Sequence, residues 1–81
     1  MATLYRADGS IEEGVSIDTL KEMQSHVGGF IEYLYSGDNV LIVNDEGRIR
    51  NLPLNGFMSS LYGAPLYGDI VMTRIEEIYE K

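Results

Sequence analysis

The chain has 81 residues, and its 13 acidic and 6 basic residues give a formal net charge of −7. This length predicts a single domain over residues 1–81, with no room for a second core. The absence of cysteine excludes a disulfide scaffold, and one histidine supplies few ligands, so we expect neither a metal nor a cofactor. The acidic balance disfavours duplex nucleic acid as a partner, because such binding uses Lys and Arg to neutralise phosphates.

The N-terminal residues carry no targeting or membrane signal. The first ten residues lack the basic start and apolar core of a signal peptide, and no apolar run approaches the about 20 residues that cross a bilayer. We therefore expect a cytoplasmic protein that does not bind a membrane. The acidic clusters at residues 8–13 and 76–80 indicate solubility or, alternatively, a surface that docks on a basic partner or imitates DNA.

The chain opens with a predicted hairpin and helix. Residues 2–6 alternate between apolar and polar, residues 7–10 (Ala-Asp-Gly-Ser) form a strong turn signal, and residues 11–15 return as a second strand. A helix is predicted over residues 18–26, with Ser16 or Asp18 as its N-cap and Gly28 as its end. We expect a capping or surface role for its single histidine, which lies in the last turn.

The middle of the chain predicts a second hairpin. Residues 30–35 alternate and are rich in aromatic and β-branched side chains, whereas residues 40–44 form a continuous apolar run typical of a buried strand. The short Ser-Gly-Asp segment between them favours a tight turn.

The last part of the chain predicts a helix and a strand. Asn55 is a suitable N-cap for a short helix over residues 55–62, which Gly63 ends. Residues 70–74 form the last strand, and the tail over residues 76–81 either extends it or frays.

These elements predict an α+β fold with a mostly antiparallel sheet of about five strands and two helices packed on one face. We expect the core to contain apolar residues from both hairpin and helix segments, namely Leu20, Met23, Val40, Ile42, Leu61 and Val71. Small cores without disulfides or metals gain stability from self-association, and this chain has many aromatic and Met side chains, so a homo-oligomer is expected.

The sequence offers no catalytic arrangement. Carboxylate doublets occur at residues 12–13, 45–46 and 76–77, but neighbouring side chains on a strand point to opposite faces. Ser59 and Ser60 have no histidine in a recognisable arrangement, and a serine nucleophile needs a base. We therefore predict no catalytic residue and no enzymatic activity.

A ligand site is predicted from clustered arginines and asparagines. In so acidic a chain, Arg48 and Arg50 are the best candidates for holding an anion. Asn51 lies beside them, and Asn55 at a helix start could present backbone N–H groups. Alternatively, both arginines lie on a solvated edge strand and pair with local carboxylates.

Four aromatic residues are the candidates for stacking on a planar base. Phe30, Tyr33 and Tyr35 belong to one strand, and Tyr67 follows the second helix. Strand alternation places Tyr33 and Tyr35 on one face and Phe30 on the other. Such rings bind a ligand or, alternatively, pack in the core or at a homo-oligomer interface.

Four short motifs occur in a fixed order: Gly-Gly-Phe-Ile-Glu at 28–32, Val-Asn-Asp-Glu-Gly at 43–47, Leu-Pro-Leu-Asn at 52–55 and Gly-Asp-Ile-Val at 68–71. Together they resemble a family of small domains of unknown function found in bacteriophages, prophages and other mobile elements. The resemblance covers most of the chain from the first helix to the last strand. It implies a small accessory protein made inside a bacterial cell, and it transfers no catalytic residue.

Small phage accessory proteins commonly act by binding. The leading hypothesis is a non-enzymatic counter-defence protein that binds and sequesters a small nucleotide-type signalling ligand in the host cytoplasm. The alternative is an acidic protein-binding inhibitor that covers a basic surface of a host defence enzyme. A structural or regulatory accessory without a ligand is a third possibility.

Overall fold

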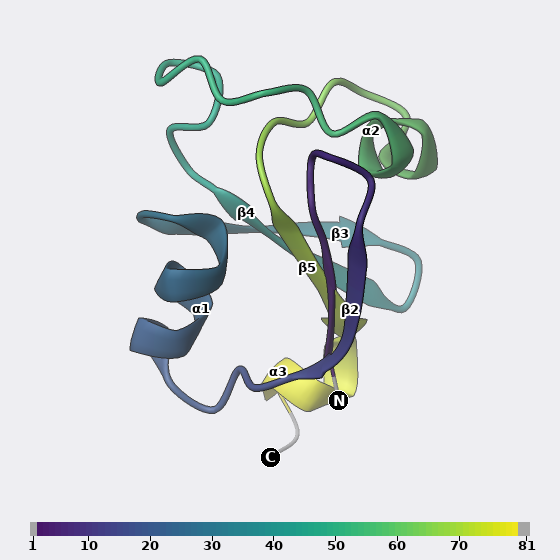
Figure 1. Ribbon diagram of the computed structural model, residues 1–81. Helices are drawn as coiled ribbons and strands as arrows, with labels where there is room; N and C mark the ends of the chain where they lie inside the picture. Colours follow the sequence, from purple (N-terminus) through teal and green to yellow (C-terminus); the bar gives the residue numbers. More distant parts are fainter. Residues whose placement is uncertain (1, 80–81) are drawn as a thin grey trace.

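An antiparallel sheet of five strands organises residues 2–79, the part of the chain that the computed structural model describes (Figure 1). The elements in chain order are β1 (Ala2–Tyr5), β2 (Ile11–Val15), α1 (Leu20–Val27), β3 (Ile31–Ser36), β4 (Asn39–Asn44), α2 (Gly56–Tyr62), β5 (Ile70–Arg74) and α3 (Ile75–Tyr79). The predicted α+β fold with an antiparallel sheet is confirmed.

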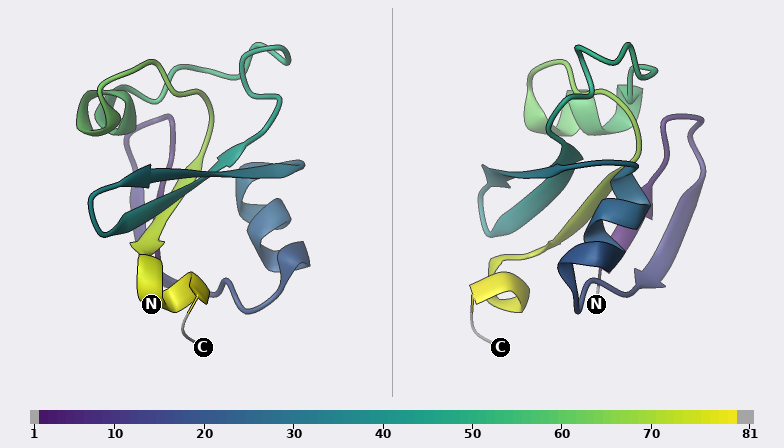
Figure 2. Two further views of the ribbon diagram at one scale, coloured as in Figure 1. Left: turned by 180° about the vertical axis from the view of Figure 1, so that it is seen from behind. Right: turned by 90° about the vertical axis from the view of Figure 1, so that its left-hand side faces the viewer.

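The strand order is β2-β1-β5-β4-β3, so β5 lies in the middle of the sheet. The hairpins β1–β2 and β3–β4 are both present as predicted, and β5 joins them by pairing antiparallel with β1 and with β4. In all views, β1 begins and α3 ends at one end of the molecule, and α2 lies at the other end (Figures 1 and 2).

The two faces of the sheet carry separate apolar clusters. On β4, Val40 and Ile42 belong to one cluster with Met23 and Val27 of α1, and α3 packs against the same cluster. Alternate residues of β4, Leu41 and Val43, belong to the other cluster.

The helix α2 contributes Met58 to the cluster with Leu41, so it lies on the face opposite α1. One face thus carries two helices, but they are α1 and α3. The prediction that the helix over residues 55–62 shares a face with the first helix is corrected: alternation along β4 makes both faces apolar, and each face therefore needs a cover.

The helix α1 begins with a capping box. Thr19 is the N-cap: its Oγ1 accepts from the Glu22 backbone N–H at 3.1 Å, and the Glu22 carboxylate accepts from the Thr19 N–H at 3.1 Å. This corrects the predicted cap at Ser16 or Asp18. Gly28 ends the helix at φ 81°, in the left-handed conformation predicted for it.

Met23, Val40, Ile42 and Val71 are buried as predicted, but two predicted core residues are not. Leu20 is 55% exposed because it lies in the first turn of α1, and Ile17, just before the helix, is buried instead. Leu61 is 47% exposed because the short helix α2 buries only Met58.

The tail forms a helix rather than an extension of β5. The Ile75 N–H donates to the Asp38 carbonyl at 2.8 Å where the strand ends. Ile75 and Ile78 are three residues apart, so they lie on one side of the helix. Both pack against the apolar cluster that contains Met23 and Val27 of α1. The predicted fraying or extension is therefore wrong for residues 76–79, while residues 80 and 81 lie outside the described part.

Candidate functional site

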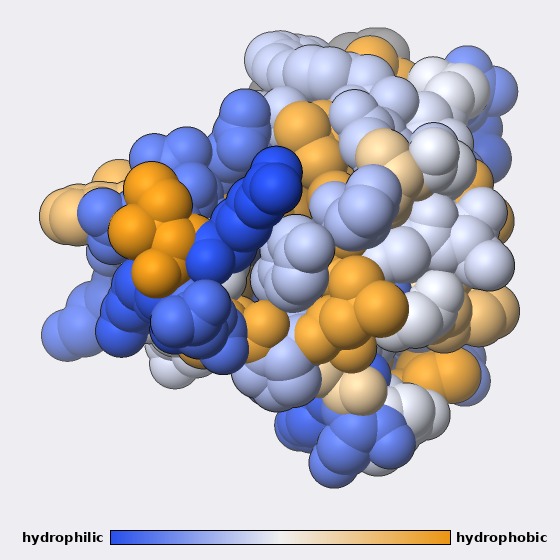
Figure 3. Space-filling view, turned by 90° about the horizontal axis from the view of Figure 1, so that it is seen from above, coloured by the Kyte–Doolittle hydropathy of each residue, from blue (hydrophilic) through white to orange (hydrophobic). Residues whose placement is uncertain are grey.

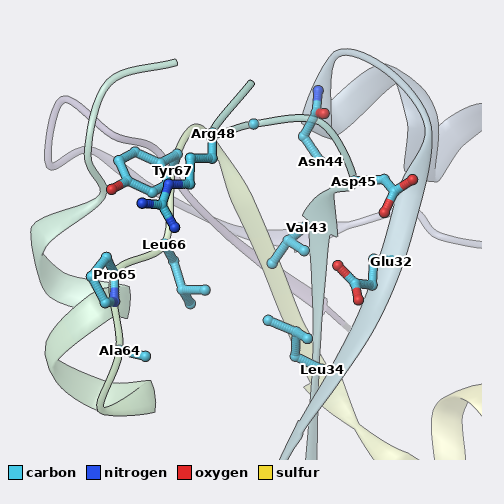
Figure 4. Close-up of a pocket in the computed structure, with 11 residues that line it drawn as sticks. Glu32, Leu34, Val43, Asn44, Asp45, Arg48, Ala64, Pro65, Leu66 and Tyr67 are labelled. Atoms are coloured by element: carbon cyan, nitrogen blue, oxygen red, sulfur yellow. The ribbon is translucent and has the colours of Figure 1, made fainter. Parts of the chain in front are cut away.

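A cleft of about 390 Å³ opens between the β3–β4 hairpin and the loop that follows α2 (Figure 4). It is lined by Glu32, Leu34, Val43, Asn44, Asp45, Gly47, Arg48, Ala64, Pro65, Leu66 and Tyr67. The volume of this cleft lies within the range of about 300–1,000 Å³ typical of clefts that hold small ligands. Its lining mixes apolar side chains with several polar and charged ones.

Two walls face each other across this cleft (Figure 4). The sheet wall carries Leu34 and Val43 with the carboxylates of Glu32 and Asp45 beside them. Glu32 pairs with Val43 across the β3–β4 ladder, which puts both side chains on one face. The other wall consists of Arg48 and the loop residues 64–67.

Hydrogen bonds fix the loop wall. The Ser59 hydroxyl accepts from the Leu66 N–H at 2.8 Å and donates to the Leu66 carbonyl at 3.2 Å. That same carbonyl accepts from the Asn55 N–H at 2.9 Å, and Tyr67 forms an isolated β-bridge with Leu54. The backbone at Tyr67 is thus held on both sides, which fixes this residue in the wall of the cleft.

The turn after β4 positions Arg48. Asn44 is buried, donates from Nδ2 to the Val27 carbonyl at 3.1 Å and accepts at Oδ1 from the Glu46 N–H at 2.8 Å. Gly47 lies so close to the loop wall that an added Cβ would be 3.2 Å from the Tyr67 carbonyl oxygen. Within residues 2–79, the exposed Arg48 side chain has no hydrogen-bond or ion-pair partner, so its guanidinium is available to an anion.

The structure divides the predicted arginine and asparagine cluster. Arg48 lines the large cleft, whereas Arg50 lines a smaller one of about 180 Å³ together with Phe30. The Arg50 Nη1 donates to the Gly28 carbonyl at 3.2 Å. Asn51 lies in the turn at φ 54°, is exposed and lines neither cleft.

The Asn55 side chain has a structural role. Its side chain is 1% exposed and uses both ends: Oδ1 accepts from the Met58 N–H at 3.1 Å, and Nδ2 donates to the carbonyls of Tyr5 at 2.9 Å and Gly68 at 3.0 Å. The predicted N-cap is confirmed, but no polar atom of this side chain is left for a ligand.

Of the four predicted stacking rings, only Tyr67 lies in the large cleft. Tyr33 and Tyr35 share a face, as alternation predicts, but it is the face of α1 and α3. The Tyr33 hydroxyl contacts Met23 Sδ at 3.7 Å, and the Tyr35 hydroxyl is hydrogen-bonded to the Tyr79 hydroxyl. That bond raises the pKa of Tyr35. Both rings therefore lie outside the large cleft, on the opposite face of the sheet.

Sequence reasoning missed the carboxylates of Glu32 and Asp45 and the loop residues Ala64 and Pro65. Strand alternation already placed Glu32 on the face opposite to Tyr33, so the negative charge of the sheet wall could have been predicted from the sequence. The loop residues carried no such signal, because only the position of α2 over this face brings them to the cleft.

No catalytic or metal role is assigned to the remaining polar clusters. His26 lines a third cleft with Ser25 and Asp69, but its Nε2 is 2.9 Å from the Ser16 carbonyl oxygen, and Asp69 accepts from the Ala7 N–H at 2.9 Å. Among residues 2–79, no group of three or more His, Asp or Glu side chains is placed to hold a metal ion. The same part of the chain contains no helix long and apolar enough to cross a membrane.

Comparison with known proteins places the chain in a family. The family described as a domain of unknown function, DUF3846, matches residues 1–80. Neither the curated proteins nor the solved structures contain a significant match. Because the family match spans nearly the whole sequence, the chain belongs to the DUF3846 family of domains of unknown function.

Proposed function

We propose that this protein is a non-enzymatic phage accessory that binds and sequesters a nucleotide-type signal in the cytoplasm of a bacterial host. The observation that carries the proposal is the meeting of Arg48 and Tyr67 in one cleft of about 390 Å³. Arginine is suited to phosphate, and a tyrosine ring is suited to a nucleobase. The phage context rests on the four ordered motifs of the sequence.

The two carboxylates restrict which nucleotide fits. Glu32 and Asp45 can accept hydrogen bonds from the N–H groups of a base but repel additional phosphate charge. One arginine against two carboxylates leaves the lining acidic, so a ligand with one negative charge per phosphate is favoured. We therefore infer a cyclic or linear phosphodiester, with a base edge rich in N–H donors, in preference to a triphosphate.

Calorimetry with cyclic and linear phosphodiester nucleotides tests the proposal, with a nucleoside triphosphate as the comparison ligand. Arg48→Ala is expected to weaken binding by about 10- to 100-fold, because a charge-assisted hydrogen bond contributes about 1.5–3 kcal/mol. Arg50→Ala is the matched control, since Arg50 lines a different cleft, and it should leave the affinity unchanged. Absence of binding heat for every nucleotide, or equal losses in both variants, would refute the assignment.

The recovered ligand tests the non-enzymatic part of the proposal. Ligand released by heating should be chemically intact, because no nucleophile–base pair is assigned to the cleft. A hydrolysed product that accumulates with time would make the protein an enzyme instead.

A second candidate function is favoured by the same two carboxylates. In the acidic-inhibitor hypothesis, Glu32 and Asp45 receive a basic side chain of a host protein. The two functions predict opposite effects of one substitution. Arg48→Ala weakens a nucleotide complex but strengthens a complex with a basic protein, because it removes a like charge. Glu32→Gln should weaken the protein complex.

A further inference from the structure

A long uncharged segment forms one end of the molecule. Residues 51–68 contain no Asp, Glu, Lys, Arg or His, although 23% of the chain is charged. The segment includes all of α2. This helix lies at one end of the molecule, and the start of β1 and the helix α3 lie at the other end (Figure 1). Viewed from this end, the left part of the surface is rich in strongly hydrophilic residues, whereas much of the right part mixes apolar groups with weakly polar residues (Figure 3).

The outer side of α2 is apolar and uncovered. Phe57 and Leu61 are 58% and 47% exposed, and their spacing of four residues places them along one side of the helix. Leu54, which is 53% exposed, directly precedes the N-cap Asn55. Phe57 also stacks on Tyr5, with ring centroids 5.4 Å apart, which fixes the orientation of its exposed ring.

The helix α2 is short and buries little apolar surface against the rest of the chain. It has seven residues and buries only Met58. Isolated helices shorter than about 12–15 residues are marginal in water, so most of the stability of such a helix comes from packing. A second apolar surface on Leu54, Phe57 and Leu61 would supply that packing.

Charge selects the occupant of this surface. Two copies of a chain with net charge −7 repel each other, and the repulsion is smallest where neither copy carries a charge. We propose that the surface formed by Phe57 and Leu61 of α2 and by the preceding Leu54 is the interface of a two-fold symmetric homodimer, in which the helices of two copies pack on each other. This interface does not depend on any ligand in the cleft.

Sedimentation of the full chain tests the interface. Protein concentrations of about 1–100 μM are used, because they would populate a dimer with a micromolar dissociation constant. The wild-type chain should be dimeric, and Leu61→Glu should be monomeric, because a two-fold axis brings the two new carboxylates together. Ile49→Glu is the matched control, since Ile49 is 82% exposed but lies outside the segment, and it should remain dimeric. Mixing Leu61→Glu with Leu61→Lys should restore a dimer.

A cysteine test covers the case in which Leu61→Glu fails to fold. The natural chain has no cysteine, so Ser60→Cys on the exposed side of α2 provides a single thiol, and Ser10→Cys in the β1–β2 turn provides the control. Oxidation should cross-link the Ser60→Cys chains much faster than the Ser10→Cys chains. A wild-type monomer at about 100 μM, a dimeric Leu61→Glu variant, or equal cross-linking at both positions would overturn the proposal.

Discussion

The Asn55 side chain connects three segments that are distant in sequence. One carboxamide caps α2 through the Met58 N–H and holds the carbonyls of Tyr5 and Gly68. Asn55→Ala should lower the free energy of unfolding by about 2–4 kcal/mol, because it removes a cap and the hydrogen bonds to the carbonyls of Tyr5 and Gly68. Chemical denaturation measures this change.

A second variant separates the two functions of this residue. Asn55→Asp retains an oxygen for the Met58 N–H but loses the donors to Tyr5 and Gly68, so it should also be destabilised. Asn51→Gly is the control: Asn51 is exposed and has φ 54°, which glycine adopts freely, so a change under about 0.5 kcal/mol is expected. If Asn55→Asp were as stable as the wild type, the contribution of Asn55 to stability would come from the cap alone and not from its bonds to Tyr5 and Gly68.

At the scale of single elements, the capping box of α1 includes a titratable carboxylate, that of Glu22. Hydrogen bonds from the Ser16 side chain and, more weakly, from Thr19 lower the pKa of Glu22 below its ordinary value. A carboxyl whose pKa is lower in the folded state contributes stability above its unfolded pKa, about 4.3, and loses it as the pH falls through the folded value. Protein stability should therefore decrease below about pH 4.

Glu22→Gln tests the source of this pH dependence. Glutamine can still accept from the Thr19 N–H in a capping box but does not titrate, so the variant should show a weaker decrease in stability at acid pH than the wild type. Thermal melts between pH 3 and pH 7 check this result. Identical pH profiles would assign the decrease to other carboxyls, such as Asp8 and Glu76, whose pKa values are also lowered by hydrogen bonds.

Elements set by neighbouring residues were predictable from the sequence, and those set by distant contacts were not. Both hairpins, the Gly28 end of α1 and the Asn55 cap followed from local turn and cap chemistry. Two features could not be predicted from local sequence: the face of the sheet on which α2 packs, and the helical form of the tail, α3. Both are determined by packing against apolar faces of a sheet formed by distant strands. In the candidate site, Arg48 and Tyr67 were predicted, but their meeting with Glu32 and Asp45 depends on that placement of α2.

At the scale of the whole molecule, unbalanced charge opposes the folded state. The molecule measures 33 × 25 × 20 Å, and at about 0.01 M salt the Debye length of about 30 Å spans it. Its acidic residues therefore repel one another across the fold. Raising the salt concentration to about 0.15 M should raise the unfolding temperature by screening this repulsion.

The experiment is best done at a protein concentration at which the chain is monomeric. Glu13→Gln, which removes one exposed negative charge, should reduce the salt effect, and Arg6→Gln, which removes a positive charge, should increase it. A fall in unfolding temperature with salt would instead mean that surface ion pairs such as Arg74–Glu76 dominate.

The position of β5 has a consequence for how the chain folds. The strand pairs with β1 and β4, so it joins the first strand of the sequence to the middle hairpin. Until β5 is in place, β1–β2 and β3–β4 are separate hairpins, each marginally stable alone. The sheet therefore forms only after a long loop has closed, and its folding rate is set by the pairing of distant strands rather than by the fast local turns.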